Sequence, residues 1–323
     1  MIRLFLENRI GVLLILPFYI GFYLFLNSQF PYYKVVGEAN LGFWSDALNG
    51  PLWIYQLLSG FFILFNAVGL NWIFNSHEFL DKNSYIVSLL YVVTMSFYHS
   101  FYSLDGLLVA QTFIILMLSQ FFLLKQNSDG RRNVFNAFFF AGVAATFHPL
   151  MLLSLPVLFG MILIIRPFVF REIFLGVCGF LVPLTYALVF LWFNNSGLDF
   201  KILDSASNFQ LQTDFIVTFV FFGILLALGT FSLRTRMQKS SIRLKKQIQI
   251  IWLMVFIAIV FGLIDFLYFH QIERFSLLMI PLSILLTYSF LHKSYGIIAS
   301  IVFYLTIIYS IVKFFIVLPS PDL

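Results

Sequence analysis

The chain has 323 residues, of which 61% are hydrophobic and only 10% are charged, and its mean hydropathy is +0.97. Apolar runs long enough to cross a bilayer recur along its whole length, which excludes a water-soluble globular protein. The single cysteine, Cys178, excludes an intramolecular disulfide and a cysteine-based metal site.

The apolar runs predict an all-α fold, a polytopic transmembrane helix bundle of about eleven spans that forms one integral-membrane domain over residues 1–323. Arg3 and Arg9 precede the first run, and no small-residue cleavage site follows it, so we expect a retained signal-anchor helix. The expected spans are 10–27, 51–70, 85–99, 106–124, 134–147, 150–165, 173–193, 215–232, 249–268, 275–291 and 296–318.

The distribution of charge predicts the orientation of these spans. If the N-terminus is cytoplasmic, the outer side holds only Lys34, Lys201, Arg274 and Lys313, and the other fifteen Lys and Arg residues lie inside. Most acidic residues fall on the outer side. We therefore expect a multi-pass protein of the bacterial inner (cytoplasmic) membrane with a periplasmic C-terminus. Its basic residues then contact membrane lipid, and nucleic acid is not an expected partner.

Three loops stand out between the spans: the outer loops 28–50 and 194–214, and the basic cytoplasmic loop 233–249. The first outer loop carries Glu38 and Asp46 among aromatic residues. It is either an ordinary interfacial loop or the holder of a carboxylate that acts as a general base. The basic stretch 234–249 is expected to lie against acidic head groups, with a protein partner at 234–249 as the alternative.

Further polar residues gather on the predicted outer side, where His99, Asp105 and His148 lie at the ends of spans. A single histidine at a helix end is usually an interfacial residue, but several at one level favour a site. With His270, these residues could bind a divalent metal, but nothing in their spacing requires one. We therefore expect no metal or other cofactor. A Gly-rich phosphate loop, H-E-x-x-H and C-x-x-C are all absent from the sequence.

The densest group of charges in an apolar context is at residues 268–281, which contain His270, Glu273 and Arg274. Ionisable residues near membrane depth are costly and mark a site by default. A helix that begins near Glu273 would add its N-terminal N–H groups to the Arg274 guanidinium and so form an anion site suited to a lipid phosphate. The alternative is a local surface ion pair between Glu273 and Arg274.

Two stretches resemble a known family. The run His270-Gln271-Ile272-Glu273-Arg274-Phe275, followed by Pro281, resembles the H-K-E-x-R-F…P signature of some GT-C membrane glycosyltransferases. Residues 141–150, with Pro156 beyond them, are similar to the G-L-A-x-L-x-x-P stretch of that superfamily. The chain departs from the pattern in Gln271, which stands where the signature has Lys, in a short first loop without D-x-D, and in lacking a large external domain.

The resemblance implies a GT-C-like fold and a glycosyltransferase that moves a sugar from a polyprenyl-phosphate carrier to an acceptor at the outer membrane face. It implies Glu38 or Asp46 as the base and Arg274 as the contact of the carrier phosphate. The expected substrate-binding residues are His270, Glu273, Arg274, His148, Asp105 and His99. One alternative is a non-catalytic scaffold subunit of a cell-envelope or secretion complex. The other is a transporter, which would need ionisable residues deep within several spans; only Asp265 comes close to such a position.

Overall fold

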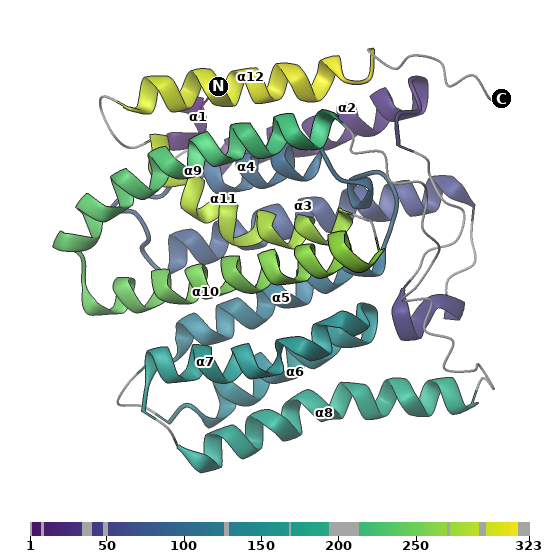
Figure 1. Cartoon of the computed structure of the whole chain (residues 1–323), viewed down its shortest axis with the longest axis vertical. Helices are drawn as coiled ribbons and strands as arrows, with labels where there is room; N and C mark the ends of the chain where they lie inside the picture. The colour runs from purple at the N-terminus through teal and green to yellow at the C-terminus, as the bar shows by residue number, and fades with distance from the viewer. Residues whose placement is uncertain are drawn as a thin grey trace.

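The computed structural model describes the chain except for residues 1, 8–9, 34–40, 48–50, 126–128, 168, 194–212, 270–271, 291–294 and 316–323. The described residues form helices and connecting turns, with no strand among them (Figure 1). This confirms the all-α prediction. Helices are the expected answer for such a sequence, because a helix satisfies its own backbone hydrogen bonds where no water can.

The longer helices are α2 (Ile15–Gln29), α3 (Leu52–Ser76), α5 (Gly106–Leu123), α6 (Arg131–Phe147), α8 (Phe170–Phe193), α9 (Thr213–Lys239), α10 (Ile242–Ile264) and α12 (Tyr295–Val312). The shorter α-helices are α1 (Ile2–Leu6), α4 (Ile86–Met95), α7 (Leu155–Ile165) and α11 (Met279–Thr287). The 3₁₀ turns are η1 (Ile10–Leu14), η2 (Gly42–Ala47), η3 (His99–Phe101), η4 (Pro149–Ser154), η7 (Glu273–Leu278) and η8 (Tyr288–Phe290). One π-helical turn, η6 (Asp265–Phe269), continues α10.

Six of the described helical stretches are long and apolar enough to cross a membrane: Ile10–Gln29, Leu52–Ser76, Gly106–Leu123, Phe170–Phe193, Ile216–Gln238 and Ile242–Tyr268. Shorter apolar helices cover Ile86–Met95, Pro149–Ile165 and Gly296–Val312. The structure thus supports a helical membrane bundle, while eleven crossings stay a prediction. The expected span 275–291 becomes η7, α11 and η8, whose residues from Arg274 to Phe290 are all buried in protein.

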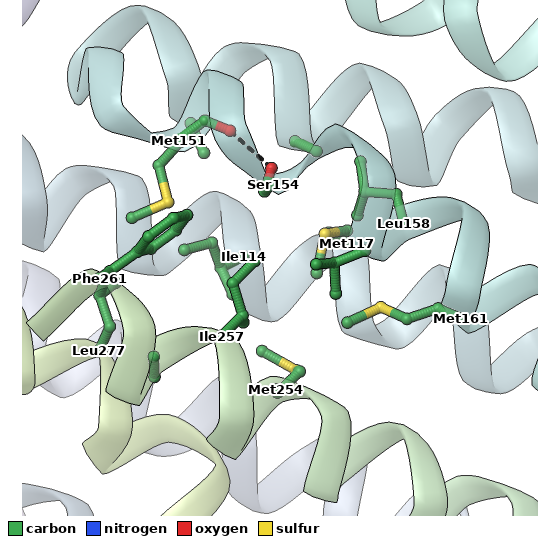
Figure 2. A pocket seen from close by; sticks show the side chains of 14 residues that line it. Ile114, Met117, Met151, Ser154, Leu158, Met161, Met254, Ile257, Phe261 and Leu277 are labelled. Atoms are coloured by element: carbon green, nitrogen blue, oxygen red, sulfur yellow. Dashed lines mark hydrogen bonds between the residues drawn. The ribbon is translucent and has the colours of Figure 1, made fainter. Parts of the chain in front are cut away.

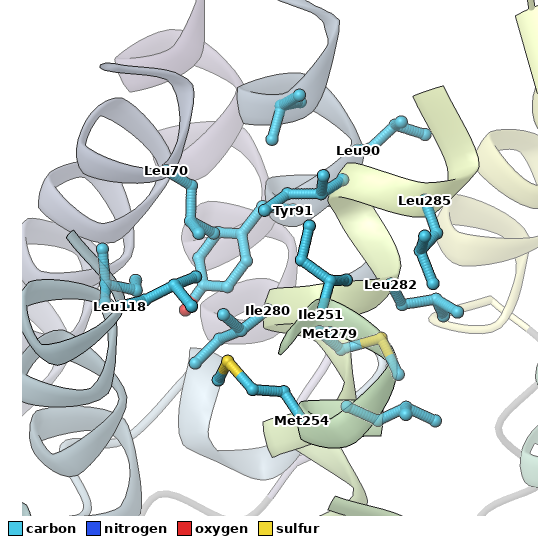
Figure 3. Packing of buried hydrophobic residues seen from close by; sticks show 14 of the residues in the cluster. Leu70, Leu90, Tyr91, Leu118, Ile251, Met254, Met279, Ile280, Leu282 and Leu285 are labelled. Carbon is cyan, nitrogen blue, oxygen red and sulfur yellow. The ribbon is translucent and has the colours of Figure 1, made fainter. Parts of the chain in front are cut away.

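Two short helices, α4 and α11, lie wholly inside the bundle. All ten residues of α4 and all nine of α11 are buried, and the ring of Tyr91 packs between Leu70, Leu118 and Ile280 (Figure 3). The outer helices present large apolar side chains such as Phe18, Trp53 and Tyr186 outward. Such faces would be unfavourable in water, and they suit lipid.

The long helices run roughly parallel across Figure 1, so the bundle has two ends. At the left of the view α9 turns into α10, and here one expectation is wrong. The predicted loop 233–249 is helical except at Ser240 and Ser241. Lys, Arg and Gln are good helix formers, and the Ser241 hydroxyl accepts a hydrogen bond from the Leu244 N–H, which restarts the helix.

Candidate functional site

Arg274 lies near the C-terminal end of α10, away from the turn that joins α9 to α10. Two side chains contact its guanidinium. Its Nη1 atom is 2.6 Å from Oδ1 of Asp265, and its Nε donates to Nε2 of His148 over 3.1 Å. Its backbone N–H also donates to Oδ2 of Asp265 at 3.3 Å. Only 7% of Arg274 is exposed. Arg274 therefore pairs with Asp265, and the local surface pair with Glu273 is not what the structure contains.

Glu273 instead contacts the turn η3, which connects α4 to α5. Its two carboxylate oxygens accept the backbone N–H of His99 at 3.2 and 3.1 Å. Burial raises the pKa of Glu273, the nearby His99 partly offsets this rise, and Asp105 and Asp265 add to it. Burial likewise raises the pKa of Asp105, while His99 and Arg274 oppose the rise. We call His99, Asp105, His148, Asp265, Glu273 and Arg274 the Arg274 cluster.

Local packing explains why η7 carries Arg274 to this place. Gly262 lies one turn before Asp265, and a Cβ there would collide with the ring of Phe275. The missing side chain lets η7 pack directly against α10. The π-helical turn that begins at Asp265 is a feature found often at functional sites.

A buried polar chain fixes η7 from the other side. The Tyr91 hydroxyl donates to Gln111 Oε1 at 2.6 Å, and Gln111 Nε2 donates to the Ser276 hydroxyl at 3.0 Å. Asn66 Nδ2 in turn donates to the Tyr91 hydroxyl at 3.2 Å. Gln111 has no exposed surface, so loss of either partner would leave a buried polar group unpaired, which is costly. The chain thus ties α3, α4 and α5 to the turn that holds Arg274.

The loop 28–50, predicted to lie on the outer side, reaches the same end of the bundle through η2. Trp44 Nε1 donates to the Thr146 hydroxyl at 3.1 Å. Gly42 has φ of +64°, and a Cβ at this position would collide with the carbonyl groups of Thr146 and Phe147. Only glycine adopts this conformation readily and fits this contact. The η2 turn is therefore fixed beside the end of α6 that is followed by His148. Asp46 belongs to η2, but its side chain and all of Glu38 lie outside the described residues.

A buried cation anchors the beginning of the same loop. Lys313 Nζ donates to the Tyr33 hydroxyl at 3.1 Å and to the Ser96 carbonyl at 2.6 Å. It also lies 4.7 and 4.6 Å from the ring centroids of Tyr33 and Phe97, where cation–π attraction is favourable. Tyr33 is the last described residue before residues 34–40, which include Glu38.

An apolar cavity lies between α5, α6, α7, α10 and the turn η7 (Figure 2). We call it the methionine cavity, because Met117, Met151, Met161 and Met254 line it together with Phe261, Leu277 and other apolar residues. The hydroxyl of Ser154 is satisfied by the Met151 carbonyl at 2.6 Å, as the dashed line shows. The cavity holds only about 40 Å³, but methionine side chains are flexible and can widen it.

The described part of the chain holds no group of three His, Cys, Asp or Glu residues that could bind a metal ion. Nε2 of His148, a candidate ligand atom, already accepts the Nε–H of Arg274.

Five of the expected site residues, His99, Asp105, His148, Glu273 and Arg274, are brought together in the cluster. His270 lies outside the described residues. Sequence reasoning considered Asp265 only for the transporter alternative, and it assigned no role to Gln111 or Ser276. Asp265 and Gln111 are polar residues inside long apolar runs, and that is the signal that could have found them.

The protonation of His148 gives a testable pH dependence. Burial, together with the charge of Arg274, lowers the pKa of His148 to about 3, so the folded protein keeps the ring neutral while an unfolded chain protonates it near pH 6.5. The stability from this residue is therefore complete above pH 6.5 and is lost as the pH falls towards 3. We expect wild type to lose on the order of 1–3 kcal/mol more than His148→Gln between pH 7 and pH 4.

Chemical unfolding in detergent at several pH values measures this difference. Gln can still accept from Arg274, so the fold is retained. His77, whose pKa is lowered to about 4 by burial and by Arg243, is present in both proteins and cancels. Equal pH profiles for the two proteins would show that His148 is not held neutral.

Comparisons with known proteins returned no matching family model, no matching curated protein and no matching solved structure.

Proposed function

We propose that the protein is a GT-C-like glycosyltransferase of the bacterial inner membrane, which moves a sugar from a polyprenyl-phosphate carrier to an acceptor at the outer face. One observation carries the proposal: Arg274, His148, His99, Asp105 and Glu273, which come from separate parts of the sequence, converge at one end of the bundle. Such a group of buried ionisable residues is expensive for a membrane protein to maintain unless it has a function.

The proposed reaction is a single displacement with inversion at the anomeric carbon. The carboxylate of Glu38 or Asp46 takes the proton of an acceptor hydroxyl, and that oxygen forms a bond to the anomeric carbon. The bond from this carbon to the phosphate oxygen breaks, and polyprenyl phosphate leaves with the electron pair. Arg274 stabilises the charge on the leaving phosphate. Asp265 and His148 hold the guanidinium in place before the reaction, so little reorganisation is needed.

Two further features support a lipid-linked donor. The methionine cavity lies next to η7 and would accept the first isoprenoid units once its side chains move aside. The fixed position of η2 against α6 brings the backbone of Asp46 to the end of the bundle where Arg274 lies. The backbone of η2 and the Arg274 cluster thus lie at the same end of the bundle, where carrier phosphate and acceptor would meet.

A second candidate is a non-catalytic scaffold subunit of a cell-envelope or secretion complex. A specific observation favours it: Arg274 is buried and already bonded to Asp265 and His148, as a purely structural arginine would be. A transporter has less support. Asp265 with its partner Arg274 is a buried ionisable pair of the kind a transport pathway needs, but it lies at one end of α10.

Removal of the base tests the proposal. We expect Asp46→Asn or Glu38→Gln to reduce transfer by about 10²–10⁴-fold, because general-base catalysis contributes that much. The assay uses the purified full chain in liposomes with a panel of polyprenyl-phosphate-linked sugars, and mass spectrometry measures the release of polyprenyl phosphate. Asp129→Asn, an exposed acid next to Arg131 at the start of α6, is the matched control.

If both variants keep wild-type transfer, the base is wrongly assigned. If the wild-type protein releases polyprenyl phosphate from none of the donors, the transferase is contradicted and the scaffold is favoured.

A further inference from the structure

The end of the bundle away from Arg274 contains a large polar cavity that plays no part in the proposed transfer reaction. Its volume is about 870 Å³. It lies between the end of α3 and the turn from α9 into α10. We call it the polar cavity; its lining includes His77, Glu78, Asp81, Arg236, Arg243 and Gln247.

Gln247 is the unusual residue of this lining. Only 4% of it is exposed, and both its Oε1 and its Nε2 lack a hydrogen-bond partner among the described residues. A buried amide left unpaired at both atoms is costly, and native proteins rarely keep one. An occupant of the cavity that both donates and accepts hydrogen bonds would satisfy it.

The charges next to Gln247 indicate the sign of this occupant. Arg243 precedes Gln247 by four residues, so both lie on one face of α10. Arg243 Nη2 lies 3.3 Å from Nδ1 of His77, and burial together with Arg243 lowers the pKa of His77 to about 4, so this imidazole is neutral at pH 7. The guanidinium and the N-terminal end of α10 thus present positive charge to the space beside Gln247.

The acids of the lining do not cancel this charge where Gln247 lies. Asp81 is exposed and pairs with Arg236 at 3.0 Å, and Glu78 is an exposed residue of the turn after α3. Arg243 is exposed as well, but among the described residues it contacts His77 and neither of these acids. The cavity therefore combines the guanidinium of Arg243, which is an exposed residue, with a buried amide that offers one donor group and one acceptor.

We propose that the polar cavity binds a phosphate ester that also carries hydroxyl groups. Arg243 and Gln247 Nε2 donate to the phosphate oxygens, and Gln247 Oε1 accepts from a hydroxyl. A phosphoglycerol group meets this description, and it exists both as a lipid head group and as a soluble metabolite. The site is separate from the Arg274 cluster, and its test does not depend on any transferase activity.

The test measures binding to the purified full chain by the shift of its thermal unfolding midpoint. One arm adds glycerol 3-phosphate to the protein in neutral detergent. The other compares nanodiscs of phosphatidylcholine alone with nanodiscs that contain phosphatidylglycerol. We expect a saturable rise of the midpoint in one arm, because a ligand that binds only the folded state stabilises it. The arm that responds identifies the soluble or the lipid source.

Variants decide whether the response comes from the polar cavity. Gln247→Leu and Arg243→Gln should each weaken the binding by about tenfold or more, as expected for loss of a hydrogen bond to a charged group. Gln247→Leu should fold, since it removes unpaired polar atoms from a buried position. Arg234→Gln is the matched control, because Arg234 is an exposed residue of α9 outside the lining.

The proposal is overturned if neither arm raises the midpoint of the wild-type protein. It is equally overturned if Arg234→Gln weakens the response as much as Arg243→Gln does, since the ligand would then bind the basic surface in general. Binding that persists in Gln247→Leu would also contradict it.

Discussion

Replacement of Arg274 by lysine is expected to reduce sugar transfer by about 10²–10³-fold, the effect of removing one preorganised donor from a catalytic site. The guanidinium bonds Asp265 through Nη1 and His148 through Nε. Lysine keeps the positive charge that Asp265 needs, but its ammonium is a point charge on a flexible chain and cannot reproduce the planar fork. The variant should therefore fold and bind lipid normally while losing transfer, which the release of polyprenyl phosphate measures.

The matched control is Arg131→Lys, which makes the same exchange in an ion pair at the start of α6. Arg131 lies 3.7 Å from Asp129 and is largely exposed, so transfer should be unchanged. Arg274→Lys with full transfer would remove Arg274 from the reaction. The convergence of the cluster would then be a structural feature, as the scaffold alternative requires.

The common location of the cluster could be predicted from the sequence. His99, Asp105, His148 and Arg274 each lie where an apolar run ends, and the distribution of basic residues assigns all four ends to the same side. Successive spans alternate in direction, so residues at such ends meet at one level. The all-helical bundle follows from the same apolar runs.

The partners within the cluster could not be predicted. Asp265 and Arg274 are nine residues apart and meet because the chain turns back after the π-helical turn η6. Gln111 and Ser276 are 165 residues apart, and nothing in either local sequence indicates their contact. The burial of α11 could not be predicted either, because an apolar sequence is equally compatible with a surrounding of lipid and with one of protein.

Breaking the buried pair from one side should produce the largest loss of stability. The side chains of Arg274 and Asp265 are only 8% and 1% exposed. We expect Asp265→Leu and Arg274→Met each to lower the free energy of unfolding by about 3–5 kcal/mol, because each leaves a charge buried without its partner. The double variant removes both charges, so its free energy of unfolding should fall by much less than the sum of the two single-variant losses. Unfolding by denaturant in mixed micelles gives the coupling energy of this cycle.

The pair Arg236–Asp81 is the control for this cycle. Its Nη2 and Oδ1 atoms are 3.0 Å apart, so it is a close ion pair too, but its side chains are 25% and 91% exposed. Its coupling energy should be only about 0–1 kcal/mol, since water already solvates both charges. If the coupling energy of Arg274 and Asp265 were as small as that of Arg236 and Asp81, water or a bound anion would have to reach Arg274 in the membrane. That result would contradict a dry, self-contained pair and would favour Arg274 as a residue that exchanges Asp265 for a phosphate.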